Sequence, residues 1–435
     1  MTAKKLLIVE VAGLGWDLVS RHPPPVRSPV FKRLETIFPA VTCAVQASFR
    51  TAALPREHGL VANGVFFRDL RKALFWEQAA ALVTGERIWH AFREQGGRVG
   101  MMFWQQSLGE SVDLILSPAP IHKHGGGMIH DCHAQPADLY ERLVNVIGRP
   151  FRLQHYWGPM ASKKSTAWIV AAVEAVLQMP AVAPDLLLAY LPHLDYDLQR
   201  YGPQSMAAAR AIEWTYGCLE RLRVSAAARG YETLFFGDYA VETVGGEAVF
   251  PNRRLREAGL FQARLVRGRA YADLFSSAAF AMVDHQIAHV YTRSDHDTCR
   301  ARETLARLPG VATILDRKAQ ASSGIDHARS GELVLIAEPG RWFAYPWWRR
   351  RGEAPDYATH VDIHNKPGYD PCELFWGWPP PSVSRDTARI CGSHGRAGPE
   401  AAVAWASSCD FPGPIDTLTD LARATRHWLT AADVE

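Results

Sequence analysis

The sequence predicts an α/β fold with a mostly parallel central sheet, covered by helices on both faces, and an inserted β-rich cap subdomain. Continuous apolar runs of strand length alternate with amphipathic stretches of helical spacing, a pattern typical of parallel sheets buried on both sides. From about 262 to 357, short β-rich pieces joined by Asp, Gly and Pro turns replace that alternation. A chain of 435 residues, 48% of them hydrophobic, is long enough to bury a large core.

The elements follow in chain order. Buried strands are expected at 5–11, 98–104, 112–117, 185–191 and 232–237, and helices at 87–95, 136–147, 166–177 and 205–228. The inserted region contains strand-like pieces at 279–283, 287–292, 332–337 and 342–345. Core-type sequence returns at 361–375 and 387–391, with a last helix near 415–430. We therefore predict a core formed by 1–261 and 358–435 and a cap formed by 262–357.

Charge and cysteine content limit the classes of protein. Lys and Arg exceed Asp and Glu by 48 − 45 = +3, too small an excess to indicate a nucleic acid polymer as partner. The basic run Arg349–Arg351 is interpreted as a solvated turn. Seven scattered cysteines without a CxxC pair indicate reduced thiols. With no signal-type leader and no apolar run of membrane-spanning length, we expect a cytoplasmic protein without a membrane span.

Candidate positions for functional residues follow three of the predicted strands, at the sheet edge where ligands usually bind. Ala12 and Gly13 follow the first strand, Asp195 follows the 185–191 strand, and Asp238 follows the 232–237 strand. Because the carboxyl ends of parallel strands meet at one edge of a sheet, functional groups are expected to gather there.

Four short motifs at fixed spacing carry a family resemblance. They are Thr42, Pro55, His58-Gly59 and Asn63; then Asp195, Gln199, Gly202 and Pro203; then Gly237-Asp238-Tyr239-Ala240; and last Ser393-His394-Gly395. In this order they resemble T…P-x-x-H-G…N, D-x-x-x-H-x-x-G-P, S-D-H-G and T-H-G of the alkaline phosphatase superfamily. The chain is similar to a divergent bacterial member of its nucleotide pyrophosphatase/phosphodiesterase (type I phosphodiesterase) branch.

The resemblance implies a hydrolase with a Thr nucleophile and two divalent cations, zinc or manganese. A bound cation lowers the pKa of a hydroxyl nucleophile, and a helix amino terminus favours a phosphoryl group. It also implies that Thr42 is the nucleophile and that Asp195, Asp238 and His394 are metal ligands. Three expected ligands are replaced, however, by Ala12, Gln199 and Tyr239. One bound ion rather than two is therefore an alternative, with Asp195 and His394 as the first place for it.

Other polar residues are candidates to compensate. Glu10 lies two residues before Ala12 on the same strand and either replaces the lost carboxylate or is a core-edge residue. His364, with Asp362, is a candidate metal ligand at the rim of the site, or else part of a turn. Gln46 is a candidate phosphate donor, because Val45 stands where the family has an Asn. Gln199 and Tyr239 would then contact substrate.

Three histidine-containing segments are interpreted as having no metal-binding role. The segment 121–133 contains His122, His124, His130, Cys132 and His133, enough for zinc, but its triple Gly favours an exposed loop near the substrate. Ser294-Asp295-His296 is predicted to be a surface turn, and Asp284-His285 a hairpin tip.

The preferred hypothesis is a metal-dependent hydrolase of phosphodiester, pyrophosphate or related phosphate-ester bonds, with a small-molecule phosphate ester or diester as partner. The alternatives are a catalytically impaired pseudo-enzyme that binds a phosphorylated metabolite or partner, and a phosphoryl transferase or mutase. Aromatic residues of the insertion lead us to expect a substrate with an apolar or aromatic group. They are Trp342, Phe343, Tyr345, Trp347 and Trp348.

Overall fold

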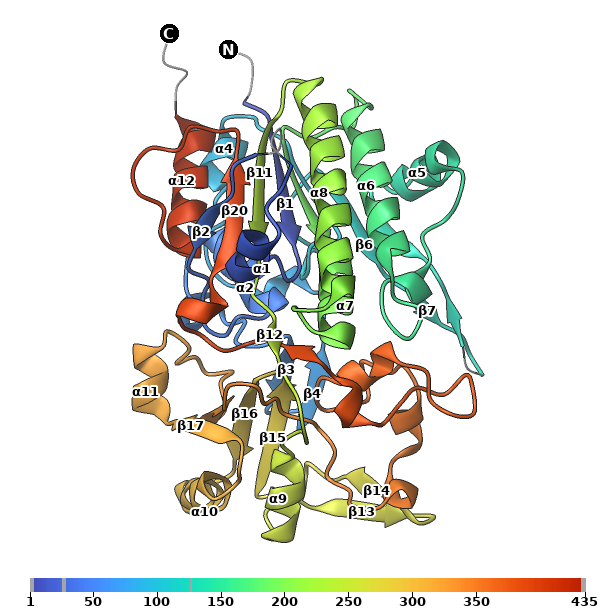
Figure 1. Ribbon diagram of the computed structural model, residues 1–435, viewed down its shortest axis with the longest axis vertical. Helices are drawn as coiled ribbons and strands as arrows, with labels where there is room; N and C mark the ends of the chain where they lie inside the picture. Colours follow the sequence, from blue (N-terminus) through green and yellow to red (C-terminus); the bar gives the residue numbers. More distant parts are fainter. Residues whose placement is uncertain (1–3, 26–28, 126, 432–435) are drawn as a thin grey trace.

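A computed structural model describes residues 4–25, 29–125 and 127–431. The molecule has two lobes (Figure 1). One lobe holds a large sheet with helices on both sides, and both chain ends lie at its outer end. The second lobe is built on a smaller sheet.

The central sheet has eight strands in the order β2-β20-β11-β1-β10-β5-β6-β9. Its five middle strands are parallel: β11 (Glu232–Gly237), β1 (Leu6–Val11), β10 (Leu186–Leu191), β5 (Val99–Met102) and β6 (Leu114–Pro118). Its edges are antiparallel: β20 (Val403–Ser407) and β2 (Lys32–Leu34) on one side, β9 (Cys132–Gln135) on the other. The predicted fold class and all five predicted core strands are thereby confirmed.

Helices cover both faces because the middle strands are apolar on both sides. Leu7 and Val9 of β1 pack in one core with α6 (Lys163–Leu177) and α8 (Met206–Ala227). Leu6 and Ile8 pack in another with α2 (Thr42–Thr51) and α12 (Leu418–Thr430). The remaining helices of this lobe are α1 (Trp16–Arg21), α3 (Pro55–His58), α4 (His90–Glu94), α5 (Leu139–Ile147) and α7 (His193–Tyr201).

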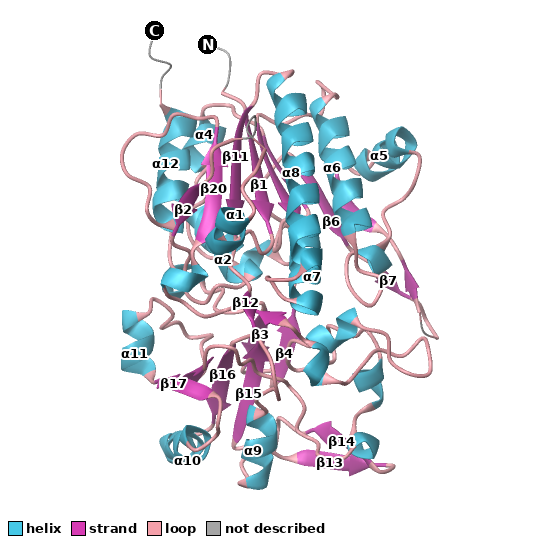
Figure 2. Ribbon diagram, in the orientation of Figure 1, coloured by secondary structure: helices cyan, strands magenta, loops and turns pink. Residues whose placement is uncertain are grey.

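The second lobe contains a four-stranded antiparallel sheet (Figure 2). Its strands, in spatial order, are β15 (Ala279–Asp284), β16 (Ile287–Thr292), β18 (Leu333–Ala337) and β17 (Val311–Leu315). The helices α9 (Pro251–Glu257), α10 (Asp295–Ala306) and α11 (Arg317–Ser322) lie in the same lobe. The hairpins are β3 (Gly64–Phe67) with β4 (Lys72–Phe75) and β13 (Ala263–Val266) with β14 (Arg269–Ala272).

Some local predictions were wrong. Residues 342–345 form no strand and carry only an isolated bridge between Phe343 and Val249. Ser294 caps α10, so its segment begins a helix instead of making a turn. Phe66 and Phe75 of the early hairpin share an apolar core with the four-stranded sheet, so early chain also joins this lobe. The domain limits at 262 and 357 stay a prediction.

No helix in residues 4–25, 29–125 and 127–431 is both long enough and apolar enough to cross a membrane.

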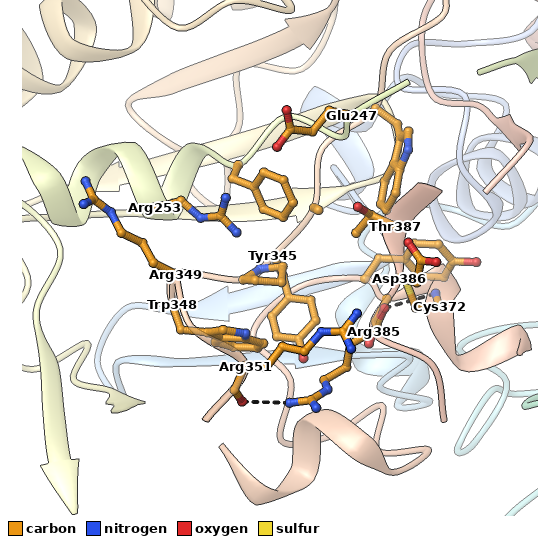
Figure 3. Close-up of a pocket in the computed structure, with 16 residues that line it drawn as sticks. Glu247, Arg253, Tyr345, Trp348, Arg349, Arg351, Cys372, Arg385, Asp386 and Thr387 are labelled. Carbon is orange, nitrogen blue, oxygen red and sulfur yellow. Dashed lines mark hydrogen bonds between the residues drawn. The ribbon is translucent and has the colours of Figure 1, made fainter. Parts of the chain in front are cut away.

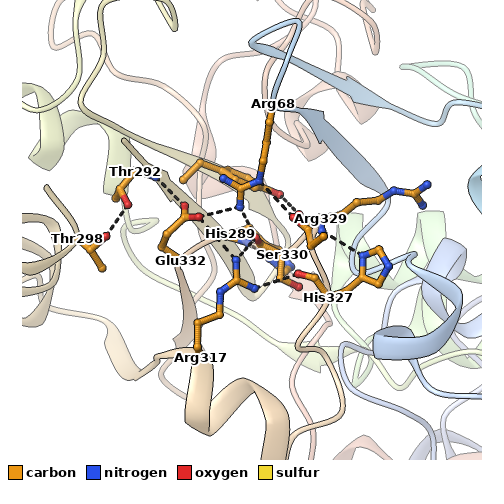
Figure 4. A network of polar contacts seen from close by, with 12 residues as sticks. Arg68, His289, Thr292, Thr298, Arg317, His327, Arg329, Ser330 and Glu332 are labelled. Carbon is orange, nitrogen blue, oxygen red and sulfur yellow. Dashed lines mark hydrogen bonds and ion pairs between the residues drawn. The ribbon is translucent and has the colours of Figure 1, made fainter. Parts of the chain in front are cut away.

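A polar network supports the four-stranded sheet (Figure 4). Arg68 pairs with Glu332 at 2.8 Å and donates to the carbonyl of Ser330 at 2.7 Å. The fully buried ring of His289 is bonded at both nitrogens: Nε2 donates to the carbonyl of Val61 (3.0 Å), and Nδ1 accepts the Gly331 N–H (3.1 Å). Burial lowers the pKa of His289 to about 4.

This geometry predicts acid sensitivity. The unfolded His289 has a pKa of about 6.5, so the unfolded chain takes up its proton first and stability falls as the pH falls from about 6.5 towards 4, by up to about 3 kcal/mol. In His289→Gln, the amide replaces both hydrogen bonds and cannot titrate. We expect a smaller loss of melting temperature between pH 7.5 and pH 5.0 in the variant. An unchanged pH dependence would contradict this role of His289.

Candidate active site

The candidate site lies where the parallel strands end against the amino terminus of α2. Thr42 is the first residue of that helix and is almost fully buried. Asp238 directly follows β11, and its Oδ2 accepts a 3.3 Å hydrogen bond from the Thr42 hydroxyl. The structure thus brings together a strand-end carboxylate and a helix-end hydroxyl, as the motifs predict.

Backbone amides hold Asp238 in place. Its Oδ1 accepts hydrogen bonds from the N–H groups of Gly13 and Tyr239, each at 2.9 Å. Glycine precedes Asp238 for a steric reason: a Cβ on Gly237 would lie 2.4 Å from the carbonyl oxygen of Leu14. The β1 loop therefore approaches β11 too closely for the Ser found there in the family motif.

Glu10 is a buried carboxylate without a hydrogen-bond donor. Within the described residues, neither of its oxygens has a partner. Burial, followed by the charge of Asp238, raises the pKa of Glu10. The side-chain Oε1 of Gln46 accepts the Gln105 N–H at 2.7 Å, while the buried Nε2 of Gln46 has no partner in the same ranges. The Gln46 side chain opposes the rise in the Glu10 pKa, so the buried carboxyl groups of Glu10 and Asp238 and the Gln46 amide lie close together.

Gln199 stands where the family motif has a metal-binding histidine, and it bonds to the carboxylate of Asp195. Its Nε2 donates to Asp195 Oδ2 at 2.6 Å, and its Oε1 accepts the Tyr369 hydroxyl at 3.0 Å. Burial raises the pKa of Asp195 to about 7, and hydrogen bonds from Gln199 and Tyr239 oppose that rise. Gln199 therefore bonds to both neighbours, while the buried Oδ1 of Asp195 has no partner among the described residues.

Tyr239 covers the remaining histidine. Its ring stacks on the ring of His394 with centroids 3.4 Å apart and planes inclined by 3°. His394 Nδ1 donates to the carbonyl of Ala40 at 2.8 Å, which leaves Nε2 as a bare acceptor without a partner among the described residues. Burial lowers the pKa of His394, so the ring is neutral.

The second lobe contributes residues that the sequence analysis missed. Asp284 and His285, interpreted there as a hairpin tip, do join β15 to β16 but are buried. The His285 ring lies 3.8 Å from that of His394, and Asp284 accepts the backbone N–H of Asn63 at 2.7 Å. The Asn63 side chain in turn accepts the Cys43 N–H at 3.0 Å. The one sequence signal for this role was the polar Asp-His pair between two apolar strands, where a simple hairpin tip needs neither charge nor imidazole.

Other predicted residues lie outside this centre. His364 is exposed, and its ring lies 6.1 Å from that of His122. The segment forms a turn, which was the alternative for it: Asp362 accepts the N–H groups of His364 (3.3 Å) and Asn365 (2.9 Å). The geometry gives the metal role predicted for His364 no support.

The retained residues do not fit the two-metal centre of the family motifs. Within residues 4–25, 29–125 and 127–431, no three His, Cys, Asp or Glu side chains are grouped so that they could hold a metal ion. Asp195 is engaged by an amide nitrogen, which is no ligand, and His394 lies under a tyrosine ring. Ala12 offers no donor atom.

The sheet topology, and a Thr at a helix amino terminus beside Asp and His residues, are the arrangement found in a family of phosphoester hydrolases with an alkaline phosphatase-like fold. The family model for type I phosphodiesterase / nucleotide pyrophosphatase matches residues 6–370. The chain therefore belongs to that family. Among the curated proteins none matches this chain.

Solved structures share the fold at low identity. Phosphonoacetate hydrolase from Sinorhizobium meliloti 1021, in complex with phosphonoformate, is 16% identical with a TM-score of 0.63; 99% of this chain and 96% of that chain are covered. Murine ectonucleotide pyrophosphatase / phosphodiesterase 5 is 14% identical with a TM-score of 0.60 and the same coverage. The human counterpart is 14% identical with a TM-score of 0.58, again at 99% and 96% coverage.

The unpaired carboxyl of Glu10 gives a stability prediction. A buried carboxylate without a donor beside another carboxyl destabilises the fold, so Glu10→Gln should raise the free energy of unfolding at pH 8 in a chelator by about 1–2 kcal/mol. Denaturant unfolding measures this change. Glu110→Gln is the control: Glu110 accepts from Arg87 at 2.9 Å, so its neutralisation should destabilise. A loss of stability in Glu10→Gln would instead show that an ionised Glu10 is needed.

Proposed function

We propose that this chain is a catalytically altered member of its family. It binds a phosphorylated small molecule and does not hydrolyse it by the family's two-metal chemistry. Tyr239 supports the proposal most directly, because its ring covers His394 where the family motif has a metal-binding histidine. Gln199 supports it independently, because its amide bonds to Asp195 and Tyr369. These substitutions act together: each fills the place of a ligand with a group that needs no cation.

Burial of the centre favours this proposal. Thr42, Asp195, Asp238, Tyr239 and His394 are all at most 5% exposed. A phosphoryl group has to approach a nucleophile to about 3 Å, which this packing does not admit without movement. The murine phosphodiesterase 5 has been solved, in an inactive form, in complex with AMP. A phosphorylated small molecule is accordingly the ligand class that we propose for this chain as well.

Hydrolysis with Thr42 as nucleophile is the second candidate, and one observation favours it. The Thr42 hydroxyl donates to Asp238 Oδ2 at 3.3 Å, and burial raises the pKa of Asp238. A carboxylate with a raised pKa is a stronger base, so Asp238 would accept the Thr42 proton as the oxygen attacks phosphorus.

Restoring the missing ligands tests the main proposal. We expect the purified protein to contain no stoichiometric zinc or manganese and to leave bis(4-nitrophenyl) phosphate intact. The triple variant Ala12→Asp/Gln199→His/Tyr239→His should bind zinc stoichiometrically, because it recreates the family's ligand types after two strand ends and on α7. Elemental analysis and a chromogenic assay measure both properties.

Single reversions serve as controls for that variant. Ala12→Asp alone keeps Gln199 and the Tyr239 ring in place and should bind no zinc. Stoichiometric metal in the unmodified protein, together with turnover, would overturn the main proposal.

Thr42→Ala separates the two candidates. Under the main proposal the variant binds the phosphorylated ligand as the parent does and loses about 1 kcal/mol of stability with the Asp238 hydrogen bond. Under hydrolysis it loses turnover of any diester that the parent cleaves. Thr51→Ala is a matched control at the other end of α2, because the Thr51 hydroxyl donates to the carbonyl of Ala47 instead.

A further inference from the structure

A cavity of about 220 Å³ lies in the second lobe, apart from the Thr42 centre. Its walls include Trp342, Tyr345 and Trp348 and the guanidinium groups of Arg253, Arg351 and Arg385. Figure 3 shows Arg351 and Arg385 near the ring of Tyr345, while the Arg253 guanidinium lies over the ring of Phe250. The residues come from α9, from the segment after β18 and from the segment before β19 (Gly392–Ser393). Neither Thr42 nor the carboxylates of the centre line it.

Its arginines are short of counter-charges. Arg349 pairs with Glu257 at 2.6 Å, but among the described residues Arg253, Arg351 and Arg385 have no carboxylate within ion-pair distance. The Nε atom of Arg253 is buried with no hydrogen-bond partner in those ranges. Burial, followed by the charge of Arg351, lowers the pKa of Arg385, so the neighbouring cations disfavour one another.

The acidic residues of the wall are mostly engaged elsewhere. Asp370 Oδ2 accepts from the Lys366 ammonium at 2.8 Å, and Asp386 Oδ1 accepts the N–H of Ala388 at 3.1 Å. Glu247 is exposed at the mouth.

Arg385 donates to the backbone carbonyl of Arg351 at 2.9 Å, and the Arg253 guanidinium lies 3.9 Å from the centroid of the Phe250 ring. Because none of these groups has a carboxylate at ion-pair distance among the described residues, a positive charge remains at the wall, and guanidinium groups are suited to a bidentate anion such as phosphate.

The apolar side of the wall sets the size and shape of the ligand. Trp342, Tyr345 and Trp348 are at most 6% exposed, and the last two meet edge to face at 5.4 Å. Cavities of about 150 Å³ hold a benzene ring, so about 220 Å³ leaves room for one ring and one small anionic group. The volume is too small for a dinucleotide. Of the aromatic residues expected to meet a substrate, Phe343 and Trp347 do not line the cavity.

We propose that this cavity is the binding site for a monocyclic aromatic phosphate, with the ring against Tyr345 and Trp348 and the phosphate on Arg351, Arg385 and Arg253. This inference rests on the proposed function, since it names the ligand class and its place. Tyr369 is the wall shared with the centre: it lines the cavity, and its hydroxyl donates to Gln199. Tyr369 thus separates the cavity from Gln199 and Asp195 of the centre.

Calorimetric titration with phenyl phosphate tests the site. We expect saturable binding that weakens about tenfold in Arg385→Gln and again in Arg351→Gln, because each removes a charge-assisted contact. Phenol and inorganic phosphate, which each carry half of the ligand, should bind much more weakly. The matched control is Arg423→Gln, whose guanidinium is paired with Asp420 on α12 at 2.7 Å; it should bind as the parent does.

Variants also separate this inference from the proposed function. Binding that is lost in Thr42→Ala and kept in Arg385→Gln would overturn the cavity and place the ligand at the centre. Binding that is lost in Arg385→Gln while the parent hydrolyses phenyl phosphate would keep the cavity and overturn the non-hydrolytic function. Equal affinity in the parent and in the double variant Arg351→Gln/Arg385→Gln, with circular dichroism unchanged, would overturn the cavity alone.

Discussion

The centre depends on how a single buried carboxylate, that of Asp238, is stabilised. It accepts N–H groups from the loop after β1 and from its own segment, and the hydroxyl at the start of α2. A buried carboxyl without such donors costs several kcal/mol, so these bonds fix three segments of the chain relative to one another. In the family motif a cation would share that task. Under the proposed function, hydrogen bonds carry it alone in this chain.

The replaced ligands form one consistent set. A glutamine supplies a donor for Asp195 Oδ2 and an acceptor for Tyr369, while Oδ1 of Asp195 has no partner among the described residues. The tyrosine adds a ring that fills the space over His394. Unpaired carboxylate oxygens nevertheless remain, because both oxygens of Glu10 and Oδ1 of Asp195 have no partner among the described residues.

The sequence was informative where the signal is local. Apolar strands identify the parallel sheet, and the motifs predict that Thr42, Asp195, Asp238 and His394 meet, because strand ends of a parallel sheet converge. It was uninformative where residues meet through folding of the second lobe. Asp284, His285 and Tyr369 follow the Thr42 motif by more than two hundred residues and carry no motif of their own. The arginine cavity was missed because Arg349–Arg351 has the composition of a solvated turn.

The position of His394 in the chain has a consequence for biosynthesis. Its ring packs on Tyr239 and His285, and its Nδ1 bonds to Ala40, which is 354 residues earlier. The five parallel strands of the large sheet can pair before the second lobe is complete, but the tyrosine ring lacks its stacking partner until residue 394 is made, and the edge strand β20 follows later still. A nascent chain that stops short of residue 394 therefore cannot complete the packing of the centre.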